Sequence, residues 1–346
     1  MITPSSLPPT TLATVARTIA TTLQQSYGVD PLPVLKSVGI DPAVIHDSGL
    51  RLSITTLGPL WRHCVAITGD EAFGLRVARY LKPASLYGVD LALFVCTTLE
   101  EAAERLVQLL NVLSTVSQPV LVEDQAGDWR LEFHLNEGIR PEAAASDCFI
   151  YAQILLFERL CGKQPDQFLR QVEMRRAPPQ DATKWQVMGS KVLFAQPIGA
   201  LVFRREAFAF LLPGTNPNLQ AQIEQPILQY LIQNGMPLPL GSLRAQLAGM
   251  LMNNPTLAGL AAYLGLSDRQ LQGMLRKQQM TFSTLLDQTR EAQVLVMLSI
   301  PELSLKEIAQ RVGFSKADHL IRAFRRWQGM PPQKYRQQLS SPSNNL

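Results

Sequence analysis

The feature that most restricts how this chain can fold is a pattern near its carboxyl terminus that occurs twice. Residues 256–267 align with residues 304–315 at an offset of 48 positions. Each copy has an apolar residue, then Ala, and a Gly four residues after that Ala, namely Gly265 and Gly313. The Ala lets a second helix approach closely, and Gly turns the chain through positive φ after a helix at least cost. The pattern therefore predicts two helix-turn-helix units.

Capping residues mark where the helices of both units are expected to begin. Ser267 and Ser304 are each followed three positions later by Gln or Glu, which is the spacing of a capping box. Ser315, with an Asp three positions later, is a weaker form of the same signal. Asn254-Pro255 predicts the first helix of the first unit, with Asn as the cap and Pro at the first helical position.

The second helix of each unit has one apolar and one polar face. Leu271 and Leu275 in the first unit, and Leu320 and Phe324 in the second, lie four residues apart and are predicted to be buried. The remaining positions carry donors that can read base edges or hold phosphates. These exposed positions are Arg269, Gln272, Arg276 and Lys277 in the first unit, and Asp318, Arg322, Arg325 and Arg326 in the second.

Residues 282–298 are predicted to form a helix that joins the two units, and Pro301 follows its end. Apolar or small residues recur on one face at positions 282, 285, 286, 289, 292, 293 and 296, with Gln293 as the polar exception. At ~1.5 Å per residue, such a helix is about 25 Å long. With the widths of the units added, we expect two recognition helices about 34 Å apart, in successive major grooves.

A segment rich in Pro and Gly, residues 234–241, separates parts of opposite charge. Residues 1–238 hold 19 basic and 22 acidic residues, whereas residues 239–346 hold 13 and 6. A basic domain suits phosphate neutralisation, although a solvated surface explains the charge equally well. The length of 346 residues also favours two domains. We predict a sensing or dimerisation domain over 1–234, a linker over 235–241 and a DNA-binding domain over 242–340.

The end of the chain resembles the AraC/XylS family of bacterial transcription regulators. The resemblance lies in Val312-Gly313-Phe314-Ser315 and in Arg322-Ala323-Phe324-Arg325-Arg326-Trp327-Gln328-Gly329-Met330-Pro331-Pro332-Gln333-Lys334-Tyr335-Arg336. It covers about residues 240–338. It implies an all-α domain that binds double-stranded promoter DNA, works with RNA polymerase and, more often than not, activates transcription.

The same resemblance implies which positions read bases. They are Arg269, Gln272 and Gly273 in the first recognition helix, and Ala317, Asp318, Ile321 and Arg322 in the second. Gly273 stands where the family usually has Arg or Lys, so readout by the first unit is expected to rest on Arg269 and Gln272. Lys316 is expected to hold phosphate.

The first two thirds of the chain are predicted to be an α+β domain with an antiparallel sheet. Helical spacing covers residues 12–25, 31–38, 54–68, 99–113 and about 143–161. Alternating apolar and charged residues predict a hairpin at 120–123 and 127–135, a strand at 172–176, and a second strand pair at 192–194 and 200–203.

Residues 25–135 resemble the arabinose-binding-like amino-terminal domain of one branch of AraC-type regulators. The resemblance lies in Gly39-Ile40-Asp41-Pro42, in residues 68–76 and in residues 87–102. It implies a small-molecule effector, a homodimer, or both, and does not imply that arabinose is the ligand. Arg62, Arg76 and Tyr87 are candidates for an anionic effector's pocket, with surface charges and a core Tyr as the alternative.

No arrangement of residues predicts a catalytic, cofactor or metal site. The four His are scattered, and the gaps of 32, 52 and 13 residues between Cys64, Cys96, Cys148 and Cys161 give no close thiolate pair. Each Cys is predicted to be a small buried hydrophobe in a cytoplasmic protein. No apolar run approaches the ~20 residues that span a bilayer, so no membrane insertion is expected.

The sequence leaves two other function classes to be tested. The first is an enzyme acting on nucleic acid, with its catalytic groups in the amino-terminal domain. The second is an adaptor whose carboxy-terminal helices bind protein instead of DNA.

Overall fold

The computed structural model describes residues 9–47, 49–82, 86–213 and 217–340. Contacts divide the chain into two units, Met1–Tyr230 and Leu231–Leu346. No helix in these described ranges is long and apolar enough to cross a membrane.

The first unit begins with a small sheet and a group of helices. β1 (Thr10–Leu12) pairs antiparallel with β2 (Arg51–Ser53). The helices are α1 (Thr14–Tyr27), α2 (Pro31–Ser37), η1 (Val44–His46), α3 (Ile54–Thr68), α4 (Phe73–Tyr80), α5 (Val89–Phe94) and α6 (Leu99–Leu113). Thr98 caps α6 by accepting the backbone N–H of Glu101 at 3.2 Å, and the Glu101 carboxylate accepts the backbone N–H of Thr97.

A five-stranded sheet forms the rest of this unit, in the order β3-β4-β7-β5-β6. Its strands are β3 (Ser117–Glu123), β4 (Trp129–Leu135), β5 (Leu169–Glu173), β6 (Lys191–Leu193) and β7 (Gly199–Phe203). The β3–β4 hairpin is confirmed, and neighbouring strands are antiparallel except for the parallel β5–β6 pair. The predicted pairing of β6 with β7 is wrong, because β5 lies between them.

The helix α7 (Ala143–Cys161) packs against this sheet through aromatic contacts. Phe157 lies 5.0 Å from Phe203, and Phe149 lies 4.9 Å from Phe133, in both cases between ring centroids and edge to face. All residues of β7 are buried, so the core sits between α7 and the middle strands. Three short helices, α8 (Pro165–Phe168), η3 (Ala182–Met188) and η4 (Arg205–Ala209), belong to this region, and the longer α9 (Pro217–Gln233) ends in the second unit.

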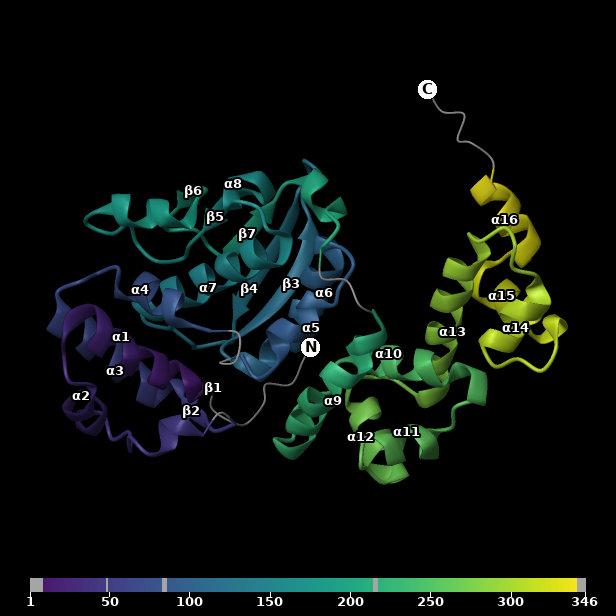
Figure 1. Ribbon diagram of the computed structural model, residues 1–346, viewed down its shortest axis with the longest axis horizontal. Coiled ribbons are helices and arrows are strands. Elements are labelled where there is room, and N and C mark those ends of the chain that lie inside the picture. Colours follow the sequence, from purple (N-terminus) through teal and green to yellow (C-terminus); the bar gives the residue numbers. More distant parts are fainter. Residues whose placement is uncertain (1–8, 48, 83–85, 214–216, 341–346) are drawn as a thin grey trace. The chain divides into compact units, whose positions relative to one another are not determined.

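The described residues of the second unit form helices joined by short turns, without a strand. Its helices are α10 (Leu240–Met250), η5 (Leu251–Asn253), α11 (Leu257–Tyr263), α12 (Asp268–Lys277), α13 (Phe282–Leu298), α14 (Leu305–Arg311), α15 (Ala317–Gln328) and α16 (Pro332–Ser340). Figure 1 shows α11 and α12 at one end of α13, and α14 and α15 at the other. The expected pair of helix-turn-helix units joined by one helix is therefore present.

The connecting helix α13 has the predicted bounds but not the predicted apolar face. Its buried residues are Leu285, Thr289, Val294 and Leu298. Positions 292 and 296 belong to the apolar face that the sequence indicates, but Ala292 is exposed and Val296 is 64% exposed. The buried stripe shifts along α13 because the second half of the helix packs into the core of the second helix-turn-helix unit, which contains Val294 and Leu298.

Two predicted helix caps are wrong. Thr256, not Asn254, caps α11 by accepting the backbone N–H of Gly259, while Asn254 has φ +49° and follows η5. The N-cap of α15 is Lys316, whose side chain makes no capping bond, and the Ser315 hydroxyl lies 3.3 Å from Nδ1 of His319. In both places the chain begins its helix one or two residues later than the sequence suggested.

Candidate nucleic-acid interface and ligand cavity

The first recognition helix, α12, begins at a complete capping box. The Ser267 hydroxyl accepts the backbone N–H of Gln270 at 3.3 Å, and the side-chain Oε1 of Gln270 accepts the backbone N–H of Ser267 at 2.9 Å. Leu271 and Leu275 are buried as predicted. The polar face is exposed and consists of Arg269, Gln272, Arg276 and Lys277.

The second recognition helix, α15, presents a similar face. Leu320 and Phe324 are fully buried, whereas Ala317 and Ile321 are half-buried beside the exposed face. The exposed residues are Lys316, Asp318, Arg322, Arg325 and Arg326. Among these, Arg326 already has an acidic partner, because it donates to Asp287 of α13 at 2.7 Å. Arg322 and Arg325 make no side-chain hydrogen bond with any described residue, so their donors are available to a ligand.

Contacts from α13 and η5 fix the turn between α14 and α15. Gly313 has φ +78°, and a Cβ atom built on it would lie 2.3 Å from the backbone oxygen of Leu251. Arg290 of α13 donates to the backbone oxygen of Val312 at 3.0 Å and lies over the ring of Phe314, 4.6 Å from its centroid. The same guanidinium donates to Asn254 at 3.2 Å. The turn is thus tied both to the connecting helix α13 and to η5 and Asn254, which precede the first helix-turn-helix unit.

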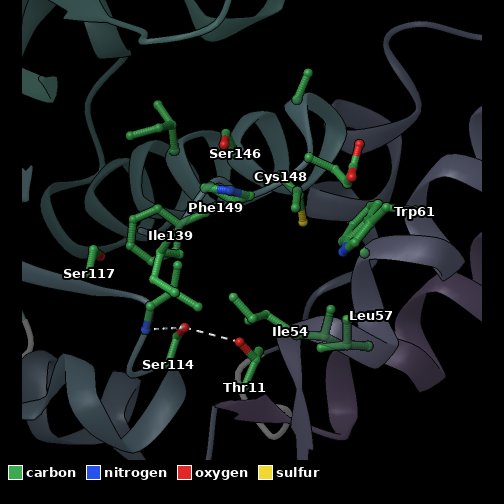
Figure 2. Close-up of a pocket in the computed structure, with 18 of the residues that line it drawn as sticks. Thr11, Ile54, Leu57, Trp61, Ser114, Ser117, Ile139, Ser146, Cys148 and Phe149 are labelled. Carbon is green, nitrogen blue, oxygen red and sulfur yellow. Dashed lines mark hydrogen bonds between the residues drawn. The ribbon is translucent and has the colours of Figure 1, made fainter. Parts of the chain in front are cut away.

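The first unit contains a cavity of about 970 Å³. Figure 2 shows its wall formed by side chains from β1, α3, α7 and the segment after α6. The hydroxyls of Thr11 and Ser114 lie 3.0 Å apart on this wall. The apolar lining includes Leu12, Ile54, Leu57, Trp61, Leu113, Phe133, Ile139, Cys148, Phe149 and Ile150. A volume of this size is in the range of small-molecule sites.

Of the three candidate effector residues, Arg62 lines this cavity, whereas Arg76 and Tyr87 lie elsewhere. Arg62 lines it and forms an ion pair with Glu142, which also lines it. Arg76 lies at a separate pocket of about 190 Å³ that also includes Asp70 and Lys184. Tyr87 has φ +51° and packs against Tyr230, with 4.2 Å between the ring centroids.

Other polar residues that line the cavity were not found from the sequence, and they include Arg140, Arg175 and Gln153. Arg176 also lines it, but its guanidinium is neutralised by Asp147, at 2.6 Å, and by Glu71. Burial raises the pKa of Asp147 above its usual range despite this pairing. No local sequence signal marks these residues, because the lining is collected from positions between 11 and 199.

The cysteines behave as buried hydrophobes, as predicted. All four are buried and free. Burial raises the pKa of Cys64 and of Cys96 to about 12, so both thiols are protonated at neutral pH. In the described ranges, no group of three or more His, Cys, Asp or Glu side chains is placed to hold a metal ion.

Two helix-turn-helix units with exposed basic recognition helices, attached to a domain that holds a ligand-sized cavity, define a transcription regulator. Residues 28–210 match the "Arabinose-binding domain of AraC transcription regulator, N-term", and residues 260–338 match a "Helix-turn-helix domain". The chain belongs to the AraC family of DNA-binding transcription regulators. This is a family of regulators and not of enzymes, which decides against the enzyme and the protein-binding adaptor.

Full-length relatives agree with this assignment. The chain is 27% identical over 322 residues to the ornithine utilization regulator of Pseudomonas aeruginosa, covering 91% of this chain and 93% of the relative. It is 25% identical over 323 residues to the HTH-type transcriptional regulator VirS of Mycobacterium tuberculosis, with the same coverage. The crystal structure of the regulator CdpR from Pseudomonas aeruginosa shares the fold, with a TM-score of 0.51 and 18% identity over 88% of this chain and 96% of that one.

Proposed function

We propose that this protein is an effector-responsive transcription activator in which α12 and α15 enter two successive major grooves of one promoter site. The observation that carries the proposal is the pair of exposed, donor-rich recognition helices at opposite ends of α13. The contacts of the Gly313 turn with Leu251 and Arg290 hold the second helix-turn-helix unit, α14 and α15, against η5 and α13. A fixed spacing between the helices is what reading two groove segments requires.

We assign different tasks to the exposed residues. Arg269, Gln272 and Arg322 read base edges, with Asp318 and the half-buried Ala317 and Ile321 shaping the contact. Arg276, Lys277, Lys316, Arg325 and Arg326 hold phosphates, and Arg326 must exchange its bond to Asp287 to do so. The proposed domains are residues 1–234 and 242–340 with the linker 235–241 between them.

The first unit is proposed to bind an effector in the cavity lined by Trp61 and Phe149. Effector binding changes DNA affinity only if the ligand prefers one state of the protein, since equal affinity for both states shifts nothing. A second protomer and RNA polymerase are the proposed protein partners, supported by the resemblance to AraC/XylS regulators.

Gel-shift titrations over a series of salt concentrations and operator variants test the DNA-binding roles. Arg322→Ala should weaken binding by about 1–3 kcal/mol on the preferred operator and relax specificity at one base pair. Lys316→Ala should weaken binding to every sequence alike and lower the salt slope by about one unit. Equal losses on all operators for Arg322→Ala would contradict its base-reading role.

A further inference from the structure

Resting on the effector role proposed above, we infer that the large cavity of the first unit binds a hydrophobic carboxylic acid, with its apolar body inside and its carboxylate at Arg140 and Arg175. In the part of the chain that the structure describes, three features of the cavity favour such a ligand: apolar walls, two Arg side chains without acidic partners and one unpaired buried amide.

The walls select an apolar body. Leu57, Trp61 and Phe149 surround the space seen in Figure 2, and further Leu, Ile, Phe and Met side chains continue the lining. Trp61 is only 4% exposed and packs edge to face on Phe73, so its position is fixed before any ligand binds. Burying hydrocarbon against such a surface contributes ~25 cal/mol per Å², which favours a ligand that is mostly apolar.

The charged lining residues are not balanced. Arg62 has Glu142 as its partner, and Arg176 has Asp147 and Glu71. Arg140 and Arg175 line the same cavity, yet neither forms a hydrogen bond or an ion pair with any residue in the described ranges. Both are exposed, so they remain hydrated and charged without a ligand. Two guanidinium groups that lack acidic partners at an apolar cavity match a ligand with one anionic end, since guanidinium binds carboxylate through paired N–H donors.

Gln153 places a buried side-chain amide, without a hydrogen-bond partner in the described ranges, at the cavity wall. It lies on α7, is 4% exposed and lines the cavity. Its side-chain oxygen is buried, and its amide makes no hydrogen bond to any described residue. An unpaired buried amide costs roughly 1–3 kcal/mol, which a ligand hydroxyl, amide or bound water would offset. The side-chain amide of Gln153 can be flipped, so either its oxygen or its NH₂ group can face the cavity, depending on what the ligand offers.

Calorimetric titration of the full-length protein tests the inference with sodium decanoate and sodium 4-phenylbutyrate as probes. Decanamide and 4-phenylbutanamide serve as neutral controls of nearly the same shape. We expect at least one acid to bind, and its amide to bind about tenfold more weakly or worse, the loss expected for a hydrogen bond to a charged group. Comparing the affinities of decanoate and 4-phenylbutyrate shows whether the cavity prefers an aliphatic or an aromatic apolar body.

Three variants locate the bound acid. Arg140→Gln and Arg175→Gln should each weaken binding of the acid several-fold and leave that of the amide unchanged, whereas Lys191→Gln, on an exposed β6 residue outside the lining, should change neither. Ala152→Phe, which adds a ring to the cavity wall, should weaken both ligands. Thermal unfolding of each variant without ligand checks that it is folded.

The outcomes separate this inference from the proposed function. Equal binding of acid and amide, or full affinity in both Arg variants, overturns the carboxylate but leaves the cavity as an effector site. Acid binding that Ala152→Phe does not change overturns the location. If neither acid binds, the ligand class is wrong. Operator binding that is insensitive to Ala152→Phe under every tested metabolite mixture would argue against effector sensing itself.

Discussion

The substitution Gly313→Ala tests whether the second helix-turn-helix unit is locked to the rest of its domain. Gly313 has φ +78°, and an added Cβ would lie 2.3 Å from the backbone oxygen of Leu251. An L-residue in the left-handed region costs roughly 1–2 kcal/mol. The close contact adds an overpacking cost of about 1–3 kcal/mol, because Leu251 belongs to the core and its backbone must shift. We therefore expect a total destabilisation of about 2–5 kcal/mol.

Gly329→Ala is the matched control. Gly329 has φ +70°, but an added Cβ would meet nothing within 4 Å, so only the backbone cost of roughly 1–2 kcal/mol applies. Hydrogen exchange of the full-length chain, followed by mass spectrometry, reports the opening free energy of α14 and α15 separately from that of α11 and α12. Gly313→Ala should also weaken operator binding more than Gly329→Ala does. Equal effects of the two substitutions would refute the reasoning that Leu251 seats this turn.

Two further predictions concern the caps and the thiols. Thr256→Ala should destabilise α11 by about 1 kcal/mol, whereas Ser315→Ala should change the stability of α15 by at most a few tenths of a kcal/mol. Hydrogen exchange measures both effects. A larger loss for Ser315→Ala than for Thr256→Ala would contradict the caps seen in the structure. Because burial raises the pKa of Cys64 and Cys96 to about 12, the native protein should resist thiol labelling at pH 8. The free energy of unfolding should hold below about pH 8.5 and fall as pH rises toward 12, since the unfolded thiols ionise first. Rapid labelling of native protein would contradict this burial.

Local signals in the sequence were sufficient for most of the helices. The bounds of α3, α7 and α13 were anticipated closely, because residues that end a helix, Gly69, Gly162 and Pro301, follow each of them. The capping boxes at Ser267 and Ser304 are present as well, since both partners of each box lie within four residues of one another. Such features depend on nearest neighbours along the chain.

Features that depend on distant residues were not predictable in the same way. The place of β5 between β6 and β7 is a choice among strand pairings that no periodicity encodes. Thr256 replaces Asn254 as a cap because Asn254 is used elsewhere, with its side chain bound to Arg290. The cavity lining shows the same limit: Arg62 lies in it, while Arg76 and Tyr87, chosen on equal grounds, lie outside it.

The most direct test of the account is a hydroxyl-radical footprint of the full-length protein on an operator selected from genomic DNA. We expect two protected segments centred about 10–10.5 base pairs apart on one face of the duplex. Gln272→Ala should weaken one segment and Arg322→Ala the other, and inserting five base pairs between the segments should abolish high-affinity binding. One protected segment that both substitutions affect alike, or binding that tolerates the insertion, would contradict reading by two helices held at a fixed spacing.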